Sequence, residues 1–443
     1  MIQKIISYRK KFLTTALVLV TFLSASPESF AAVAFQDIQQ AENNFNQYDG
    51  KVVDSQSKKA LVFASISIDG TNISTVTNTE GDFTLKVPKN ITTGTVSVSF
   101  LGYKSKSISL SDLKNKKNRI SLDISVTELS EVNISIPRSA EALVMETLAK
   151  KGDNYFDDHT VMTAFYRETI KRRRRNVSLS EAVVNIYKTP YTSKRRDAVK
   201  LYKARKSTDY SRLDTVALKL QGGPFNALFV DIIKYPQYIF AKETIGDYSF
   251  TFDRSTQIDG KLIYVINFKQ KKGVFYPLYH GKLYIDADKK ILTSAIYSLN
   301  VTDRDEASKL FVRKKPSNAS VYPTEVAYRV DYREKDGRWY YSYSNVQLEF
   351  KINWDKKLFN SVYRMTCEMA VTDWEKNLDQ ERLKSKERIR SSIILSDEAI
   401  GFADPNFWGE YNIIEPEKSI ESAIKKIQRQ MRRANRASGN SKP

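Results

Sequence analysis

The chain has 443 residues, and its 71 lysines and arginines outnumber its 51 acidic residues to give a formal net charge of +20. Its single cysteine, Cys367, excludes an internal disulfide, so stability has to come from ordinary hydrophobic cores. A chain of this length is expected to form two domains.

The first residues have the three-part layout of a cleaved secretion signal. Basic residues up to Lys11 precede an apolar run from Phe12 to Leu23, and small residues lead on to Ala31. The run is shorter than the about 20 residues that span a bilayer, so a retained membrane anchor is the less favoured alternative. We expect residues 1–31 to be removed and the mature protein to be exported to the periplasm, where it is free or peripheral to the outer membrane.

The positive charge indicates an anionic partner. Nucleic acid is the usual partner of so basic a chain, but an exported protein rarely meets it. Lipid phosphates or another anionic envelope component are therefore expected, and no nucleic acid. The alternative is that the charge only keeps the protein soluble.

Residues 46–136 have the pattern of a small antiparallel β-sandwich. Apolar and polar residues alternate from Val62 to Ile68, and turn-forming pairs such as Asp69-Gly70 interrupt the strands. A period of two with frequent turns is typical of such sandwiches. Gly81 and Gly102 are expected at positive φ or at close backbone contacts.

Three motifs in this region resemble those of the carboxypeptidase regulatory-like domain, a seven-stranded prealbumin-like sandwich. They are Gly50–Asp54, Thr79–Phe83 and Phe100–Tyr103. The resemblance implies an accessory module that brings no peptidase chemistry with it.

A connecting helix is expected over residues 137–152. Pro137 and Ser139 give a start signal, and Lys150-Lys151-Gly152 gives a stop. Such a helix would serve as a spacer or would dock on the second domain.

Residues 160–415 are rich in strands and in aromatic side chains. Met162–Thr169 and Ser178–Tyr187 predict two long strands joined by a basic turn, and alternating segments continue up to Val371. The apolar run after Pro224 predicts a buried helix behind a proline start. Many consecutive antiparallel strands with few helices predict an α+β second domain in a mainly β chain.

This second domain resembles the lipoprotein-carrier-like half-barrel. The resemblance rests on Ile258–Ile266, Gly281–Asp286 and Ala295–Leu299. Three further motifs are similar to those of exported Bacteroidota proteins that carry a regulatory-like domain before such a half-barrel: Phe165–Glu168, Ser178–Ala182 and Asp404–Glu417. The resemblance implies a curved antiparallel sheet that wraps around helices and leaves an apolar cavity, and it implies no particular activity.

The sequence has no recognisable set of catalytic residues. His159 and His280 lack the spacing of zinc ligands, and neither a G-x-S-x-G motif nor a P-loop is present. Cys367 falls in an alternating strand pattern, which predicts a core residue. We therefore predict no catalytic residue, no metal site and no cofactor.

The candidate ligand-binding side chains are cationic or aromatic. Guanidinium groups of the basic turn could hold phosphates, and the tyrosines that follow Trp339 alternate, so that some face a surface or a cavity. Solvated loop charge and core packing are the alternatives. The candidates are Arg172, Arg173, Arg174, Arg175, Tyr341 and Tyr343.

Residues 416–436 predict a basic amphipathic helix, followed by a disordered tail at 437–443. The apolar residues Ile420, Ile424 and Ile427 recur at helical spacing on one side. The helix would lie on an anionic membrane or dock on the half-barrel. The candidate residues for a membrane or partner contact are Lys425, Lys426, Arg429, Arg432 and Arg433.

These observations predict a non-enzymatic periplasmic protein that binds an apolar or amphipathic ligand or a lipid-bearing envelope component. A protein-interaction scaffold that contacts an outer-membrane protein is the first alternative, and a hydrolase is the second. The sequence does not indicate the oligomeric state.

Overall fold

The computed structural model describes residues 44–125, 139–173, 175–208, 220–253, 255–258, 261–312, 315–355, 360–401 and 407–417. The predicted signal peptide, the tail and all but the first two residues of the predicted C-terminal helix lie outside these ranges. The same holds for Lys425, Lys426, Arg429, Arg432 and Arg433.

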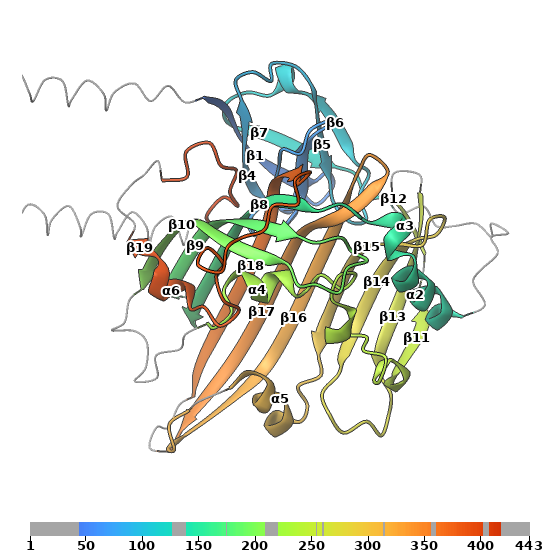
Figure 1. Ribbon diagram of the computed structural model, residues 1–443, viewed down its shortest axis with the longest axis vertical. Helices are drawn as coiled ribbons and strands as arrows, with labels where there is room; N and C mark the ends of the chain where they lie inside the picture. Colours follow the sequence, from blue (N-terminus) through green and yellow to red (C-terminus); the bar gives the residue numbers. More distant parts are fainter. Residues whose placement is uncertain are drawn as a thin grey trace, which may run out of the picture. The chain divides into compact units, whose positions relative to one another are not determined.

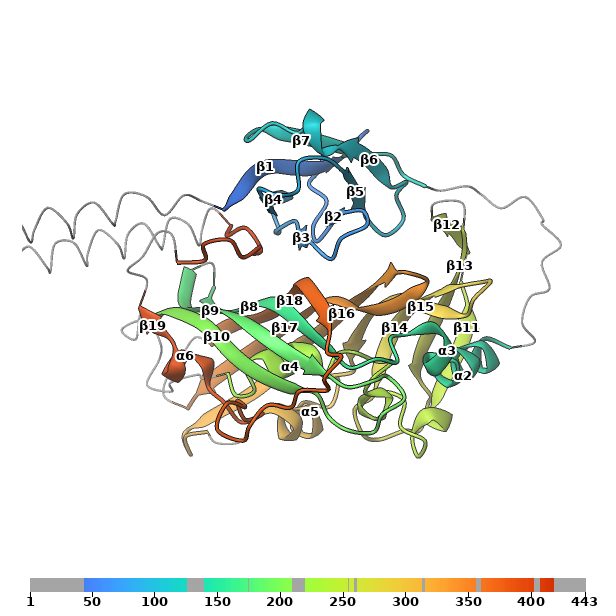
Figure 2. The ribbon, with the colours of Figure 1, turned by 45° about the horizontal axis from the view of Figure 1, so that its top comes forward.

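The first domain is a sandwich of two sheets, as the alternating pattern predicts (Figure 2). One sheet has the order β4-β1-β7 and the other β3-β2-β5-β6, and the pairs are antiparallel except for β1 with β7. Inward-facing residues such as Val52, Ile66 and Leu85 form its core. The strands are β1 (Phe45–Asp54), β2 (Ser65–Ile68), β3 (Ser74–Val76), β4 (Asp82–Pro88), β5 (Thr95–Ser99), β6 (Lys106–Ser109) and β7 (Asn118–Leu122), with a 3₁₀ turn η1 at Leu110–Asp112.

The turn before β4 requires a glycine. Gly81 has φ +79°, and a Cβ atom there would lie 2.8 Å from the carbonyl oxygen of Val52. The side chain of Asn78 closes the turn by accepting the backbone N–H groups of Glu80 and Asp82. Positive φ at Gly81, and likewise at Gly102, confirms the sequence-based expectation.

The helix expected after the sandwich is α2 (Ala140–Ala149), followed by the short α3 (Lys151–Asn154). Ser139 caps α2, because its hydroxyl accepts the backbone N–H of Ala142 at 3.0 Å. Leu143 and Val144 are buried in the core of the second domain. The helix is therefore docked on that domain.

The second domain is built on one large curved sheet that does not close on itself (Figure 1). Ten antiparallel strands follow in the order β11-β13-β14-β15-β16-β17-β18-β8-β9-β10, with β12 beside β13 and β19 parallel to β10. This arrangement confirms the predicted fold class. The strands are β8 (Thr160–Arg172), β9 (Arg175–Lys188), β10 (Ala198–Thr208), β11 (Tyr248–Phe252), β12 (Thr256–Ile258), β13 (Lys261–Gln270), β14 (Tyr279–Asp286), β15 (Ile291–Leu299), β16 (Ala319–Lys335), β17 (Arg338–Trp354), β18 (Ser361–Lys376) and β19 (Ile400–Gly401).

Short helices accompany this sheet. They are α4 (Pro224–Leu228), α5 (Arg304–Phe311) and α6 (Leu395–Glu398), together with the 3₁₀ turns η3 (Pro236–Tyr238) and η4 (Ile245–Asp247). The buried helix expected after Pro224 is α4, and it is only five residues long. Pro224 begins the helix, and the chain continues in turns after Leu228. A helix this short is stabilised by tertiary packing rather than by helical propensity.

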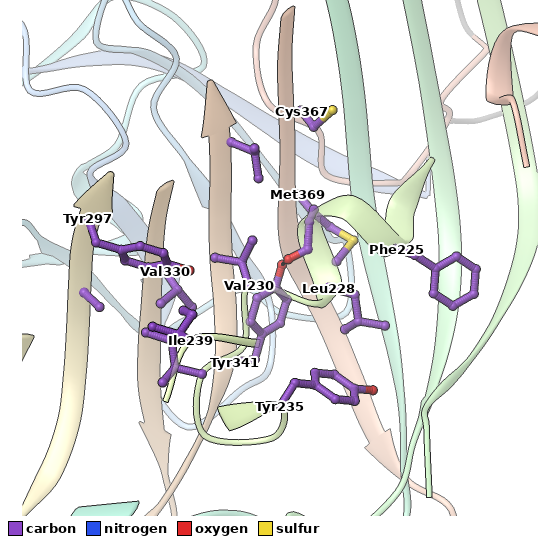
Figure 3. Close-up of a cluster of buried hydrophobic side chains, with 14 of the residues drawn as sticks. Phe225, Leu228, Val230, Tyr235, Ile239, Tyr297, Val330, Tyr341, Cys367 and Met369 are labelled. Atoms are coloured by element: carbon purple, nitrogen blue, oxygen red, sulfur yellow. Dashed lines mark hydrogen bonds between the residues drawn. The ribbon is translucent and has the colours of Figure 1, made fainter. Parts of the chain in front are cut away.

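The chain after α4 covers the inner face of the sheet at β17 and β18. Phe225, Leu228 and Val230 are buried, and Figure 3 shows Leu228 and Val230 near Tyr341 and Met369 of the strands, with the ring of Phe225 farther to the right. The resemblance to a half-barrel implies an open apolar space at this face. Here the described residues of the chain between β10 and β11 pack their side chains against this face at β17 and β18.

A buried ion-pair network pins this segment to the sheet. The Lys188 ammonium lies 2.8 Å from a carboxylate oxygen of Asp231 and 3.1 Å from one of Asp197. The hydroxyl of Tyr332 donates to the second oxygen of Asp231 at 3.0 Å. Because all of these groups are buried, removing one partner would leave a costly unpaired charge.

Three motifs that carried the second resemblance meet on the outer face of the sheet. Arg167 donates to Glu181 at 2.7 Å, to Glu368 at 3.1 Å and to the carbonyl oxygen of Ile414 at 2.6 Å. Arg205 donates to the second oxygen of Glu181 at 2.8 Å. The motifs therefore form one buried network that fixes the C-terminal segment 407–417 on β8, β9 and β18.

The segment 407–417 also contacts the sandwich. The amide side chain of Asn412 pairs with the backbone of Lys86 in β4, with hydrogen bonds of 2.7 and 3.0 Å. The hydroxyl of Thr75 donates to the carbonyl oxygen of Ile413 at 3.0 Å. Both domains belong to one compact unit that begins at Phe45. The segment 407–417 is one of the connections between them.

Candidate functional site

A cavity of about 300 Å³ lies between the sandwich and the outer face of the large sheet. Its volume is at the lower end of the about 300–1,000 Å³ that is typical of ligand pockets, which occur preferentially where domains meet. Phe63, Phe100 and small polar residues of β2, β3 and β5 form the sandwich wall. The sheet wall includes Ile263, Ser294, Arg329, Asp331, Ser342, Tyr343 and Val371.

Strand register explains why two charged residues point into this cavity. Arg329 and Asp331 are two residues apart in β16, so their side chains share the outer face. A bulge then follows, because Asp331 pairs with Tyr343 but Tyr332 pairs with Tyr341. The extra residue, Ser342, shifts the side-chain alternation by one position. Tyr343 therefore lines the cavity, while Tyr341 lies on the inner face.

Arg329 is the most informative group in the cavity. Its side chain is only 16% exposed, and its Nε donates to Asp331 at 2.8 Å. The guanidinium carbon lies 5.9 Å from the ring centroid of Phe63 and 5.5 Å from that of Phe100. Within the described ranges, its two terminal NH₂ groups have no hydrogen-bond partner. They are therefore available to an acceptor in the cavity.

The rest of the polar lining is arranged around this cation. The second oxygen of Asp331 accepts the hydroxyl of Ser294 at 2.6 Å. The ring centroids of Tyr343 and Phe63 are 5.0 Å apart, and the Tyr343 hydroxyl makes no hydrogen bond to a residue that the structure describes. Burial raises the pKa of Tyr343 well above its ordinary value, so the phenol is neutral and can donate.

The charges that line the cavity balance one another. The lining has three basic residues, Lys261, Arg329 and Arg333, and three acidic residues, Asp286, Asp331 and Glu334. Arg329 is paired with Asp331, and Lys261 lies 3.7 Å from Glu334 in an exposed pair. Asp286 accepts the backbone N–H groups of the turn that follows it, which fits the capping role expected from its turn position. The cavity therefore suits a ligand that has an apolar body and one hydrogen-bond acceptor, rather than a highly charged one.

Of the predicted ligand-binding side chains that the structure describes, Tyr343 alone lines this cavity. Tyr341 is fully buried on the opposite face, where its hydroxyl lies 2.7 Å from that of Ser344. Strict alternation would place Tyr341 and Tyr343 on the same face, and the bulge puts them on opposite faces. The bulge at Ser342 decides which tyrosine meets the cavity, and nothing in the sequence marks it.

The predicted basic turn joins β8 to β9, as expected, and does not line the cavity. Arg172 donates to the hydroxyl of Ser361 at 3.4 Å and lies 5.9 Å from the ring centroid of Tyr363. Arg173 is exposed, with φ +54°. Arg174 and the side chain of Arg175 lie outside the described residues. A role for this turn in binding stays a prediction.

Sequence reasoning missed Arg329, Asp331, Ser294, Phe63 and Phe100. A weak signal was present, because two opposite charges share one face of β16 in an otherwise strand-like segment. Using that signal requires knowing that the sandwich covers this face. The cavity is made of segments far apart in the sequence, and their meeting cannot be derived from strand periodicity.

The residues weighed for catalysis have other surroundings. In the part of the chain that the structure covers, no three or more His, Cys, Asp or Glu side chains gather in a way that could hold a metal ion. Cys367 is buried in the core of the large sheet, as predicted, and burial raises the pKa of its thiol to about 12. Among the helices within the described ranges, none has the length and apolar character to cross a bilayer.

Comparisons with known proteins identify the first domain. Residues 48–134 match the family model of the CarboxypepD_reg-like domain. The curated proteins contain no match to the chain. The match agrees with the motifs of the sandwich and extends over its strands.

Solved structures give only distant similarities. A DUF1329 family protein from Desulfovibrio piger is 10% identical over 55% of this chain and 95% of its own, with a TM-score of 0.22. A LolA superfamily protein from Nitrosomonas europaea is 9% identical over 58% of this chain and 100% of its own, with a TM-score of 0.19. Lipovitellin is 9% identical over 53% of this chain and 27% of its own, with a TM-score of 0.23. At such scores these similarities carry no argument about the function of the chain.

Proposed function

We propose that this protein is a non-enzymatic binding protein that holds a small amphipathic molecule in the cavity between its two domains. The observation that carries the proposal is Arg329, a largely buried cation placed near two aromatic rings with N–H groups directed to no protein acceptor. A guanidinium without a protein acceptor can form charge-assisted hydrogen bonds to a ligand carboxylate or phosphate, in place of its hydrogen bonds to water.

The lining suggests how such a ligand would be held. Phe63, Phe100 and Ile263 would bury its apolar part, which stabilises a complex by about 25 cal/mol for each Å² removed from water. The guanidinium of Arg329 would donate two parallel hydrogen bonds to a carboxylate or phosphate oxygen pair. The ring of Tyr343 adds apolar surface to the same wall.

The volume limits the size of the ligand. A cavity of about 300 Å³ has room for about ten water-sized groups. This fits a short acyl chain or an aromatic acid, and it excludes a whole phospholipid unless most of the lipid stays outside. The predicted binding of an amphipathic ligand is therefore kept, but its place moves from the inner face to the domain interface.

The proposal includes export to the periplasm, which rests on the layout of residues 1–31. It also includes the absence of an enzymatic activity. The buried, protonated thiol of Cys367 supports this part, because a thiolate is the form that acts as a nucleophile.

A binding titration tests the proposal directly. The full chain is titrated with octanoic acid by isothermal titration calorimetry, because its ten non-hydrogen atoms match the cavity, and the wild type is expected to bind it. Arg329→Met removes the donor and is expected to raise the dissociation constant by about tenfold or more, the equivalent of one charge-assisted hydrogen bond.

The matched control is Arg364→Met. Arg364 is also paired with a carboxylate on the same sheet, at 2.8 Å from Glu349, but it does not line the cavity. Its replacement should leave the dissociation constant unchanged. Equal affinities of the wild type and Arg329→Met would contradict the proposed site.

The filled inner face favours a second candidate, a scaffold that contacts an envelope protein. With Phe225, Leu228 and Val230 covering the sheet at β17 and β18, no ligand is needed to complete this part of the core. Affinity purification of the full chain from its own envelope distinguishes the candidates. Recovery of a stoichiometric protein partner with an empty cavity would support the scaffold over the carrier.

A further inference from the structure

The hairpin between β13 and β14 presents an apolar side chain to solvent. Phe275 is 88% exposed, more than any other large hydrophobic residue in the described part of the chain. Tyr276 beside it is 43% exposed, whereas Leu278 at the base of the hairpin is buried. An aromatic ring kept in water at the tip of a hairpin indicates a contact that the isolated chain does not provide.

Hydrogen bonds at the base of the hairpin fix its conformation, so Phe275 is not free to fold back onto the core. The side chain of Gln270 donates to the carbonyl oxygen of Val274 at 2.7 Å and accepts the backbone N–H of Leu278 at 3.0 Å. The hydroxyl of Tyr276 donates to a carboxylate oxygen of Asp247. These bonds order the loop before any partner arrives.

Several lysines lie close to Phe275 in the sequence. Lys269, Lys271 and Lys272 are exposed in the hairpin. The chain around η4 lies beside it, because Lys271 donates through its backbone to Asp247 and through its ammonium to the carbonyl oxygen of Gly246. This neighbouring segment adds Lys242, Glu243 and Asp247, so cations outnumber acids around Phe275.

We propose that this hairpin docks on an anionic lipid bilayer by inserting Phe275 at the level of the headgroups. This combination suits a membrane interface. The aromatic rings would contact the acyl chains just under the headgroups, and the flanking lysines would contact the lipid phosphates. The lysines can extend their ammonium groups to the lipid phosphates while their methylene chains follow the ring.

Leu378 offers a contrast within the same chain. It is 83% exposed, close to the value for Phe275, but acids match bases around it, with Glu375, Asp379 and Glu381 beside Lys376, Arg382 and Lys384. An anionic surface would therefore attract this site less. Exposure of an apolar side chain is common to both sites, and an excess of basic residues is found at Phe275.

Insertion can be measured with tryptophan at these two positions in the full chain. Phe275→Trp and Leu378→Trp are mixed with vesicles of equal parts phosphatidylglycerol and phosphatidylcholine that carry brominated acyl chains. The Phe275→Trp variant is expected to show a blue shift and quenching beyond the wild-type tryptophans, and Leu378→Trp is not. Equal quenching of the two variants would overturn the proposal.

Partition between buffer and vesicles gives a second readout. Phe275→Ser is expected to weaken partition about tenfold, because the variant loses the burial of one aromatic ring. Phe275→Trp should restore it, and Leu378→Ser should bind as the wild type does. The basic residues after Glu417 are present in every variant and cancel in the comparison. Unchanged partition of Phe275→Ser, or capture of a protein through Phe275 by a chain that ignores vesicles, would refute bilayer docking.

Discussion

Glu168 is a carboxyl group buried on the inner face of the large sheet. It follows Arg167 in β8, and strand alternation sends the two side chains to opposite faces. The hydroxyl of Tyr166 donates to it at 3.0 Å. Burial is the main cause that raises the pKa of Glu168 to about 7 from its ordinary 4.5.

This raised pKa makes the stability of the fold depend on pH. Between about pH 4.5 and pH 7 the folded chain keeps a proton that the unfolded chain releases. The free energy of unfolding should therefore fall as the pH rises through this window, by about 3 kcal/mol from Glu168 alone. The contribution is fully lost above the folded pKa.

Replacement of Glu168 by glutamine removes this titration. Glu168→Gln is expected to be as stable as the wild type near pH 4.5 and more stable by up to about 3 kcal/mol near pH 8, measured by urea unfolding. Glu325→Gln, at an exposed position of β16, is the control and should keep the wild-type pH dependence. A Glu168→Gln variant with an unchanged slope would refute the assignment.

At the scale of elements, the segment 407–417 joins the two domains. Its Asn412 satisfies one N–H and one C=O group of Lys86, both in a buried strand. Trp408 packs against Phe165 with ring centroids 5.4 Å apart, and Arg167 holds the carbonyl oxygen of Ile414. This short irregular segment thus adds Trp408, Ile413 and Ile414 to the apolar cluster in which Val76 of the sandwich meets Phe165 of β8.

Asn412→Ala tests this joint. The change leaves two backbone groups of Lys86 without partners and should lower the free energy of unfolding by about 1–3 kcal/mol. Urea unfolding measures the loss. Glu410→Ala, at an exposed position of the same segment, should stay within about 0.5 kcal/mol of the wild type. Equal stability of the two variants would mean that the segment does not hold the sandwich.

Several elements could be predicted from the sequence because their signals are local. Alternation and the basic turn define β8 and β9, and Ser139 marks the start of α2. The helix after Pro224 is shorter than its apolar run suggests. The apolar side chains beyond the helix are buried in turns that cover the inner face of the sheet. A continuous apolar run has no alternation of apolar and polar residues, so periodicity does not predict how much of it is helical.

At the scale of the whole molecule, the candidate site depends on how the sandwich meets the sheet. The sequence predicted both modules, and it predicted cations and tyrosines as ligand contacts. Of these candidates Tyr343 lines the cavity and Arg172 does not, whereas the cavity cation Arg329 was not among the candidates. The walls of the cavity come from β2, β5, β16 and β17, and only the packing of these strands puts Arg329 beside Phe63 and Phe100.

Two surfaces of the molecule now have separate proposed roles. The cavity around Arg329 would hold a small amphipathic ligand, and the hairpin around Phe275 would contact an anionic bilayer. The two lie toward opposite ends of β13, since Lys261 and Ile263 line the cavity and the hairpin follows Gln270. Loss of one function should therefore leave the other intact.

Native mass spectrometry of the full chain recovered from its own envelope tests the central claim most directly. The wild type should carry a bound small molecule, and Ser99→Trp, which places an indole in the cavity wall, should lose that added mass while staying folded. The same added mass on both proteins, or none on the wild type, would contradict the account of the cavity as a binding site.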